Sequence, residues 1–152
     1  MLVVRALERR DVESAARIIR EGSLTPGVEH PASVEAYWRA AEETRARGGD
    51  VLVAEDDGAV VGVVQVIVFP HFQHTGGWCC ELESVYVRSD SRGRGVGAAM
   101  LSAAEALARE RGCYRIQLTS RNVRVEAHRF YATHGYEQTS QGFKKPLDGD
   151  LA

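Results

Sequence analysis

VYVRSDSRGRGVGAAMLSAAEALA, residues 85–108, is the stretch that decides the fold. It combines a β-branched strand end, a short loop of arginine and glycine, and a helix with apolar residues at helical spacing. Gly93, Gly95 and Gly97 stand where the backbone turns into the helix. Because these positions lack side chains, successive N–H groups can converge on an oxyanion, with the positive end of the helix dipole behind them. The pattern predicts a phosphate or pyrophosphate site; the alternative is a glycine-rich turn with solubilising arginines.

Arginines beside the turn favour the anion site, and the usual nucleotide motifs are absent. Arg88, Arg92 and Arg94 add positive charge next to the glycines. A P-loop needs Gly-Lys-Ser/Thr, and the chain has lysines only at 144–145. The turn does satisfy G-x-G-x-x-A, but five residues separate its first glycine from the strand, and the next strand ends in QLTSRN without the ribose-binding acid. A dinucleotide site is therefore a weaker interpretation.

Hydrophobic periodicity extends this reading to the rest of the chain. The expected order is β-α-α-β-β-β-α-β-α-β-β, an α/β (α+β) fold with one mixed sheet covered on both faces. Asp57-Gly58 predicts a tight hairpin turn. Strands are expected at 2–7, 51–56, 59–69, 78–87 and 114–120, with a short strand pair within 136–147; helices are expected at 12–22, 34–48, 96–111 and 123–134. We expect residues 1–152 to form a single domain.

Composition points to a globular protein. Hydrophobic residues make up 44% of the chain and charged residues 26%, and no apolar run approaches a membrane span. The N-terminal sequence MLVVRALERR lacks the features of a signal peptide, so we expect a cytoplasmic protein without a membrane partner.

The net charge of −2 conceals an uneven distribution. Residues 1–87 hold eight arginines against 14 acids, whereas residues 88–129 hold nine arginines against four acids. The basic segment favours an anionic ligand, or else a solvated helix face. The acidic total and the lack of a basic-aromatic strand motif argue against nucleic acid.

The cysteines predict neither a disulfide framework nor a metal centre. Three cysteines are an odd number in a chain without a secretory signal. His71, His74, Cys79 and Cys80 could be ligands, but their spacing matches no ligand pattern, and neighbouring strand residues point to opposite faces. We expect no bound metal.

Two motifs resemble the GCN5-related N-acetyltransferase superfamily, in particular small bacterial enzymes that modify free amines. The first is R-x-x-G-x-G, formed by Arg92, Gly95 and Gly97 between a strand and a helix. The second is EAHRFYATHGY at 126–136, which is similar to the family's A-x-x-F-Y-x-x-x-G-F/Y segment. Together with the order of elements, the resemblance covers nearly the whole chain and implies an acetyl-CoA-dependent N-acetyltransferase.

The resemblance also implies how the cofactor binds. The pyrophosphate of acetyl-CoA would lie on the amides of 92–97 and the pantetheine arm along 85–87, where the strands at 78–87 and 114–120 splay apart. The implied cofactor-binding residues are Val85, Tyr86, Val87, Arg92, Gly93, Arg94, Gly95, Val96, Gly97 and Asn122. Asn122 stands five residues before Ala127, a departure from the family's commoner spacing of three. Arg124 points either toward the cofactor or toward water.

The implied chemistry is direct acetyl transfer to an amine. Tyr131 matches the family's acid position, and a phenol of pKa about 10 is protonated at neutral pH. Its alternative role is core packing beside Phe130. Glu83 is the candidate general base, Glu81 shares its face by strand alternation, and for either one a surface position is the alternative.

The acceptor side is expected in the segments 23–38 and 69–78, with Glu29, Tyr37, Trp38 and His71 as candidate substrate contacts. Aromatic walls and the acidic first half of the chain suit a cationic amine. The expected acceptor is a small-molecule primary amine; the alternatives are a non-catalytic acyl-CoA-binding regulator and an enzyme that acetylates a protein amine. Whether the chain forms a homodimer, as the family often does, stays open.

Overall fold

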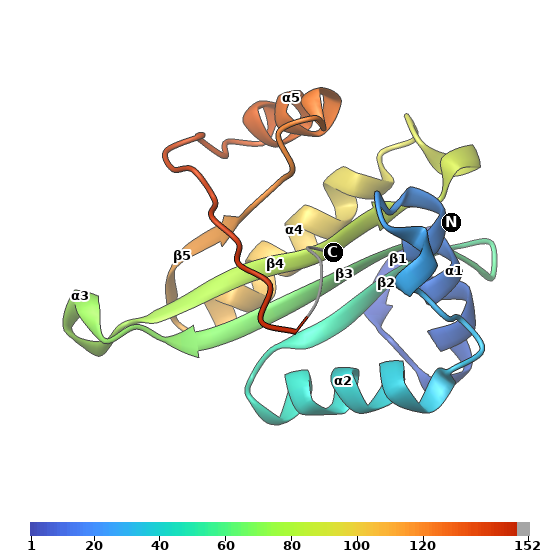
Figure 1. Ribbon diagram of the computed structural model, residues 1–152, viewed down its shortest axis with the longest axis horizontal. Coiled ribbons are helices and arrows are strands. Elements are labelled where there is room, and N and C mark those ends of the chain that lie inside the picture. The colour runs from blue at the N-terminus through green and yellow to red at the C-terminus, as the bar shows by residue number, and fades with distance from the viewer. Residues whose placement is uncertain (149–152) are drawn as a thin grey trace.

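A computed structural model describes residues 1–148 and shows one five-stranded sheet in the order β1-β2-β3-β4-β5 (Figure 1). Neighbours from β1 to β4 run antiparallel, and β4 and β5 run parallel. The strands are β1 (Leu2–Ala6), β2 (Asp50–Asp56), β3 (Ala59–Pro70), β4 (Trp78–Val87) and β5 (Cys113–Leu118). The mixed sheet expected from the sequence is confirmed.

Helices cover both faces of this sheet. The helices are α1 (Val12–Gly22), α2 (Val34–Ala46), the single turn α3 (Gln73–Gly76), α4 (Val96–Glu110) and α5 (Val125–Thr133). On one face, α1 and α2 pack on the central strands through a core that includes Val12, Val53 and Val63. On the other face, α4 places Met100 and Leu101 against the same strands. The two cores share the β-branched central strands, which explains why these strands are apolar on both faces.

The turn between β2 and β3 has the conformation that its sequence predicts. Asp57 and Gly58 both have positive φ, 48° and 83°. Two successive left-handed residues form the hairpin turn that matches the twist of antiparallel strands, and Asp-Gly tolerates it. The predicted hairpin is confirmed.

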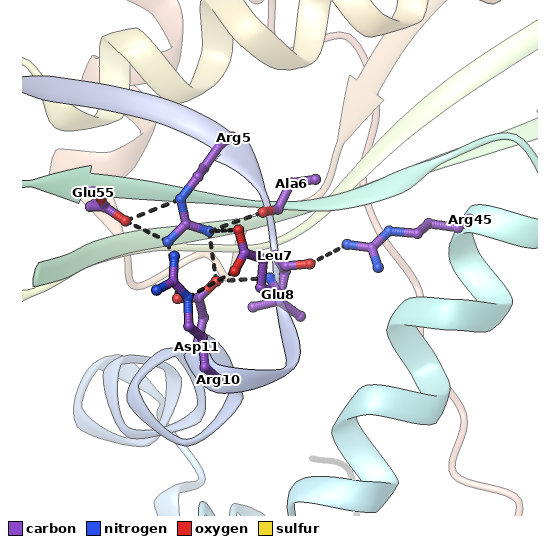
Figure 2. Close-up of polar contacts among 8 residues, drawn as sticks. All are labelled: Arg5, Ala6, Leu7, Glu8, Arg10, Asp11, Arg45 and Glu55. Atoms are coloured by element: carbon purple, nitrogen blue, oxygen red, sulfur yellow. Dashed lines mark hydrogen bonds and ion pairs between the residues drawn. The ribbon is translucent and has the colours of Figure 1, made fainter. Parts of the chain in front are cut away.

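A network centred on Arg5 ties β1 to β2 and to the start of α1 (Figure 2). Its guanidinium donates to both carboxylate oxygens of Asp11, at 2.7 and 3.0 Å, and through Nε to Glu55 at 3.0 Å. Asp11, only 5% exposed, also accepts the backbone N–H of Glu8 at 2.8 Å. Burial alone would raise the pKa of Asp11, but these hydrogen bonds outweigh burial and hold that pKa below its ordinary value.

The strand pair expected within 136–147 is wrong. No strand is assigned in the described residues after α5, and residues 137–148 are all exposed. The run EQTSQ offers no apolar face that pairing could bury, and Pro146 lacks the N–H that a ladder needs. The segment instead turns back and crosses in front of the sheet (Figure 1).

Within residues 1–148, none of the helices combines the length and the hydropathy that crossing a bilayer requires.

Candidate active site

A cleft opens where β4 and β5 part. The parallel pairing runs from Trp78 beside Cys113 to Leu82 beside Leu118, where β5 ends, whereas β4 continues to Val87. The chain leaves the sheet after Leu118 and turns into α5, so within residues 1–148 no strand pairs with the second half of β4 on this side (Figure 1). The opening has a volume of about 190 Å³. The splaying of the two strands expected from the family resemblance is present.

A β-bulge at Ser84 sets which side chains of β4 face the cleft. Gln65 pairs with Glu83 but Val63 with Tyr86, so β4 carries one extra residue, and Ser84 has a φ of +53°. After the bulge, Val85 joins the α4 core together with Leu82, although the two are three residues apart. The bulge thereby interrupts the β3 ladder beside the open half of β4.

The cleft is built from four parts of the chain that are distant in sequence. They are the end of α1 and its loop, β4, the segment from β5 into α5, and the C-terminal segment. The lining residues are Ser23, Leu24, Thr25, Leu82, Glu83, Ser84, Val85, Tyr86, Leu118, Thr119, Ser120, Arg121, Arg124, Ala127, Tyr131 and Lys144. Tyr131 and Glu83, the two residues expected to carry the chemistry, thus line the same cleft.

Tyr131 reaches the cleft from α5 with its hydroxyl open. Its ring packs against Phe130 and Tyr136 and is half-buried. Its Oη makes no hydrogen bond with a described residue, yet no buried side-chain N or O atom among those residues lacks a partner, so this oxygen retains access to solvent. Burial raises the pKa of Tyr131, Arg124 opposes the rise and Tyr86 adds to it. The phenol is therefore protonated at neutral pH.

Glu83 faces the cleft from β4, and Glu81 does not. Gln117 Nε2 donates to Glu81 at 3.3 Å, which ties Glu81 to β5, whereas Glu83 makes no hydrogen bond or ion pair with a described residue. Neighbouring atoms shield the Glu83 carboxylate from water, and this desolvation raises its pKa. The negative charge of Glu81 raises that pKa further, and the positive charge of Lys144 lowers it. A raised pKa makes Glu83 a stronger base than an ordinary glutamate.

Arg124 spans the cleft from the start of α5 to the end of α1. Its Nη2 donates to the Gly22 carbonyl at 2.8 Å, and its guanidinium lies 5.6 Å from the centre of the Tyr86 ring. Tyr86 in turn packs so closely on Gly22 that a Cβ there would lie 2.6 Å from the ring. Arg124 thus points across the cleft, not simply into water.

The glycine-rich turn has the conformation that an anion site needs. Gly93 and Gly95 have φ of +74° and +83°, in the left-handed region, and a Cβ at either would meet no neighbouring atom. Gly95 begins α4 without a side-chain cap, and the first N–H groups of a helix have no intrahelical acceptor. Arg92 lies beside the strand end, with its Nε donating to the Val87 carbonyl at 3.3 Å. Arg94 is exposed, and Val96 is the first residue of the helix.

Packing joins this turn to the second motif. A Cβ at Gly97 would lie 2.8 Å from the Phe130 ring, so glycine allows α5 to approach the first turn of α4. Gly135 ends α5 at a φ of +88°, and Tyr136 donates its hydroxyl to Glu105 of α4 at 3.0 Å. The spacing F-Y-x-x-x-G-Y therefore anchors α5 on α4 at both ends, with Tyr131 between the anchors.

Several predicted site residues lie away from the cleft. Asn122 occupies an exposed turn before α5. Tyr37 accepts the His30 N–H at 2.9 Å and donates to Glu29 at 3.4 Å, a local contact of the α1–α2 loop. Trp38 packs in the α1–α2 core, with Arg45 over its ring.

His71 lies at the opposite end of β4 from the cleft. It follows β3, next to the α3 turn, and its Nδ1 lies 2.5 Å from the hydroxyl of Tyr114 near the start of β5. Of the two segments expected to hold the acceptor, only 23–25 lines the cleft, and 69–78 does not.

Much of the cleft lining was not among the predicted contacts, and Lys144 lies outside every segment expected to form the site. It comes from a segment without a motif, and its position depends on how the irregular chain returns across the sheet. A weak signal existed for Lys144, because the chain has only two lysines and they are adjacent.

The charge of the cleft differs from the expectation of an acidic acceptor side. Among the described residues, its lining holds Arg121, Arg124 and Lys144 against the single acid Glu83. Many acids of the first half pair with cations elsewhere, as Asp11 does with Arg5. The sum of charges over a segment therefore does not describe the cleft.

No metal site is indicated within residues 1–148. No group of three or more His, Cys, Asp or Glu side chains among them is arranged to hold an ion. All three cysteines are free thiols, and burial raises the pKa of Cys80 to about 12, with Cys113 and Cys79 adding to it.

Comparison with known proteins identifies the arrangement. A sequence model of the acetyltransferase (GNAT) family matches residues 15–136. The chain is 33% identical to glucosamine 6-phosphate N-acetyltransferase 1 of Oryza sativa over 138 residues, 88% of this chain and 79% of that protein. It is 34% identical to aminoalkylphosphonate N-acetyltransferase of Salmonella typhimurium over 91 residues, 60% of this chain and 58% of that protein's length.

A solved structure has the same fold over nearly its full length. The crystal structure of a transcriptional regulator from Bacillus halodurans superposes with a TM-score of 0.89 at 29% identity, covering 97% of this chain and 100% of that one.

Proposed function

The chain belongs to the acetyltransferase (GNAT) family, and on that premise we propose that it transfers an acetyl group directly from acetyl-CoA, the family's acyl donor, to the primary amine of a small molecule. One observation carries the proposal: the open hydroxyl of Tyr131 and the unpaired carboxylate of Glu83 line the same cleft. A proton donor and a proton acceptor in one opening are what acyl transfer to an amine requires.

The residues present fit the cofactor. The left-handed Gly93 and Gly95 and the first amides of α4 offer donors to a pyrophosphate, with the Arg92 and Arg94 side chains beside them. The open half of β4, Val85–Val87, offers backbone groups to an extended amide-containing arm, because β5 no longer pairs there. Acetyl-CoA supplies an acetyl group activated as a thioester.

The chain's own groups handle the protons. Glu83, with its raised pKa, accepts a proton from the attacking amine, directly or through a water molecule. Tyr131, which burial keeps protonated, donates its hydroxyl proton to the departing sulfur. Arg124 and Tyr86 hold the end of α1 against the cleft and so fix one wall of the acceptor side.

A small-molecule acceptor is favoured over a protein amine. The cleft volume of about 190 Å³ lies below the range of about 300 to 1,000 Å³ typical of drug-sized pockets. Both relatives described above are named for small amines. A cytoplasmic location and a single domain over 1–152 stay predictions of the sequence, and whether the chain forms a homodimer stays open.

The test is to incubate the protein with acetyl-CoA and a metabolite extract and to identify products heavier by one acetyl group. We expect release of free thiol together with one or a few acetylated amines, and loss of both in Tyr131→Phe. Acetyl-CoA, but not NADH, should raise the melting temperature. Thermal stabilisation by acetyl-CoA without thiol release across a broad amine panel would contradict the proposal.

That outcome would support the second candidate, a non-catalytic acyl-CoA-binding regulator. The observation that favours it is the similarity to the structure described as a transcriptional regulator. The unpaired Glu83 and Tyr131 weigh against it, because a binding protein has no need to hold a base and an acid open to its ligand.

A further inference from the structure

Positive charge gathers at the reacting end of the cleft, apart from the glycine-rich turn. Lys144 from the C-terminal segment and Arg124 from the start of α5 line the same opening as Glu83 and Tyr131. No residue of the turn at 92–97 lines it. The proposed function places the cofactor's pyrophosphate at that turn, which leaves these two cations for another ligand.

Lys144 is placed to meet an anion. It makes no hydrogen bond or ion pair with any residue in the described range, and it is exposed within the open cleft. Lys144 and Glu83 line the same opening, and the positive charge of Lys144 lowers the pKa of that carboxyl. Lys145, the next residue, does not line the cleft.

Arg124 retains donors for a ligand. A guanidinium carries five N–H donors, and one from Arg124 reaches the Gly22 carbonyl. Arg124 also lines the same opening as Tyr131, whose pKa its positive charge lowers. Stacking over Tyr86 fixes the plane of the guanidinium, which lowers the entropy lost when the guanidinium binds an oxyanion.

Hydroxyl groups complete the wall around these cations. Ser23 and Thr25 on the α1 side and Thr119 and Ser120 after β5 line the opening. Hydroxyls and charged nitrogen donors together are the groups that bind phosphate, phosphonate and carboxylate oxygens. A lone cationic amine would find one carboxylate here and be repelled by the cations.

We propose that the acceptor is a small amine that also carries an oxyanion, with Lys144 and Arg124 binding the oxyanion while Glu83 faces the amine. This inference rests on the proposed function and adds the substrate class. It assigns Lys144 as the residue that determines specificity.

The first test compares amines that differ in charge. Thiol release is measured with 2-aminoethylphosphonate, O-phosphoethanolamine and β-alanine, and with ethanolamine and 1,3-diaminopropane as neutral and dicationic counterparts. We expect kcat/KM to be at least about tenfold higher for one of the anionic amines than for the last two, which corresponds to about 1.4 kcal/mol. Equal or higher values for ethanolamine or the diamine would overturn the inference and leave the acetyltransferase function standing.

The second test uses variants at neighbouring lysines. Lys144→Ala should reduce the preference for the anionic over the neutral amine about tenfold, and Lys145→Ala should leave it unchanged. If the role of Lys144 were merely structural, Lys144→Ala would lower kcat/KM for the anionic and the neutral amine by the same factor, and the ratio of the two would not change. Lys144→Glu should move the preference toward the diamine.

The third test separates the site from the chemistry. Binding of ethylphosphonate, which has no amine to acetylate, is followed by NMR titration of the wild type and the two alanine variants. Saturable binding that weakens about tenfold in Lys144→Ala but not in Lys145→Ala supports the oxyanion site even if no amine is acetylated. Absence of binding, or equal binding by all three proteins, overturns it.

Discussion

The Arg5 network and the β4–β5 cleft both bring charged side chains together from distant parts of the chain, but they use them in opposite ways. Around Arg5, two carboxylates accept from one guanidinium, and Asp11 also receives a backbone N–H. In the cleft, Glu83, Lys144 and Tyr131 form no such pairs with described residues. The comparison shows that polar groups satisfied by one another hold the fold, whereas those left open are available to a ligand.

The largest effect is expected when Asp11 is removed from the Arg5 network. Asp11→Ala removes the buried carboxylate that accepts two hydrogen bonds from Arg5 and leaves Arg5 with Glu55, Glu8 and the Ala6 carbonyl. We expect a loss of about 3 kcal/mol in the free energy of unfolding, measured in urea. Glu13→Ala, which breaks only the exposed pair with Arg17, should cost less than about 0.5 kcal/mol. Equal losses would contradict the assigned role of Asp11.

The stability that Asp11 contributes depends on pH, and the direction follows from its lowered pKa. The pKa of Asp11 is lower in the folded protein than its unfolded value of about 3.9, so its contribution is complete above that value and is lost as the pH falls through the folded pKa. The difference in stability between wild type and Asp11→Ala should therefore narrow as the pH falls below the unfolded pKa of about 3.9.

In the cleft, substitution should affect turnover and not stability. Tyr131→Phe removes a hydroxyl that makes no hydrogen bond with a described residue, so the melting temperature should stay the same while kcat falls about 100-fold, about 2.7 kcal/mol. Tyr136→Phe is the matched control, because its hydroxyl bonds Glu105. It should lose about 1 kcal/mol of stability and keep its kcat. Unchanged turnover in Tyr131→Phe would remove the acid assignment.

The glycine-rich turn allows stability and binding to be separated, because the same backbone strain can be introduced at a second left-handed glycine outside the cofactor site. Gly95→Ala and Gly48→Ala both place a side chain at positive φ with no neighbouring atom, so each should destabilise by about 1 kcal/mol. Only Gly95→Ala should weaken coenzyme A binding, about tenfold by isothermal titration calorimetry. A similar loss of affinity in Gly48→Ala would show that the turn has no specific role.

The smallest effect is on the acid limb of the pH–rate profile. Because the pKa of Glu83 is raised, kcat/KM should fall as the pH drops through a value above that of an ordinary glutamate, and Glu83→Gln should abolish this limb. Lys144→Ala removes a charge that lowers this pKa, so the limb should move to higher pH by less than about one pH unit. A downward move would contradict the assigned position of Lys144.

Local chemistry explains which parts of the fold could be predicted. The Asp57-Gly58 hairpin and the glycine turn before α4 depend on backbone conformations that few residues adopt, and both are in the structure. Tyr131 could be placed because its neighbours Phe130 and Tyr136 anchor α5 on α4.

The remaining site depends on the path of irregular segments. The polar run after α5 forms no strand, and this irregular return brings Lys144 to Glu83, which no periodicity predicts. Aromatic residues of α2 were expected at the acceptor side, but Trp38 serves the core instead. The acidic sum over residues 1–87 does not describe the cleft for the same reason, since pairing in space decides which charges stay open.

The bulge at Ser84 determines which face of the sheet each later side chain of β4 occupies. Strand residues alternate between faces, so one inserted residue exchanges the faces for everything that follows. Without it, Val85 and Val87 would leave the α4 core, and Tyr86 would turn away from Gly22 and Arg124. The extra residue Ser84 thus reverses the alternation of side chains between the first half of β4, which pairs with β5, and the second half, which does not.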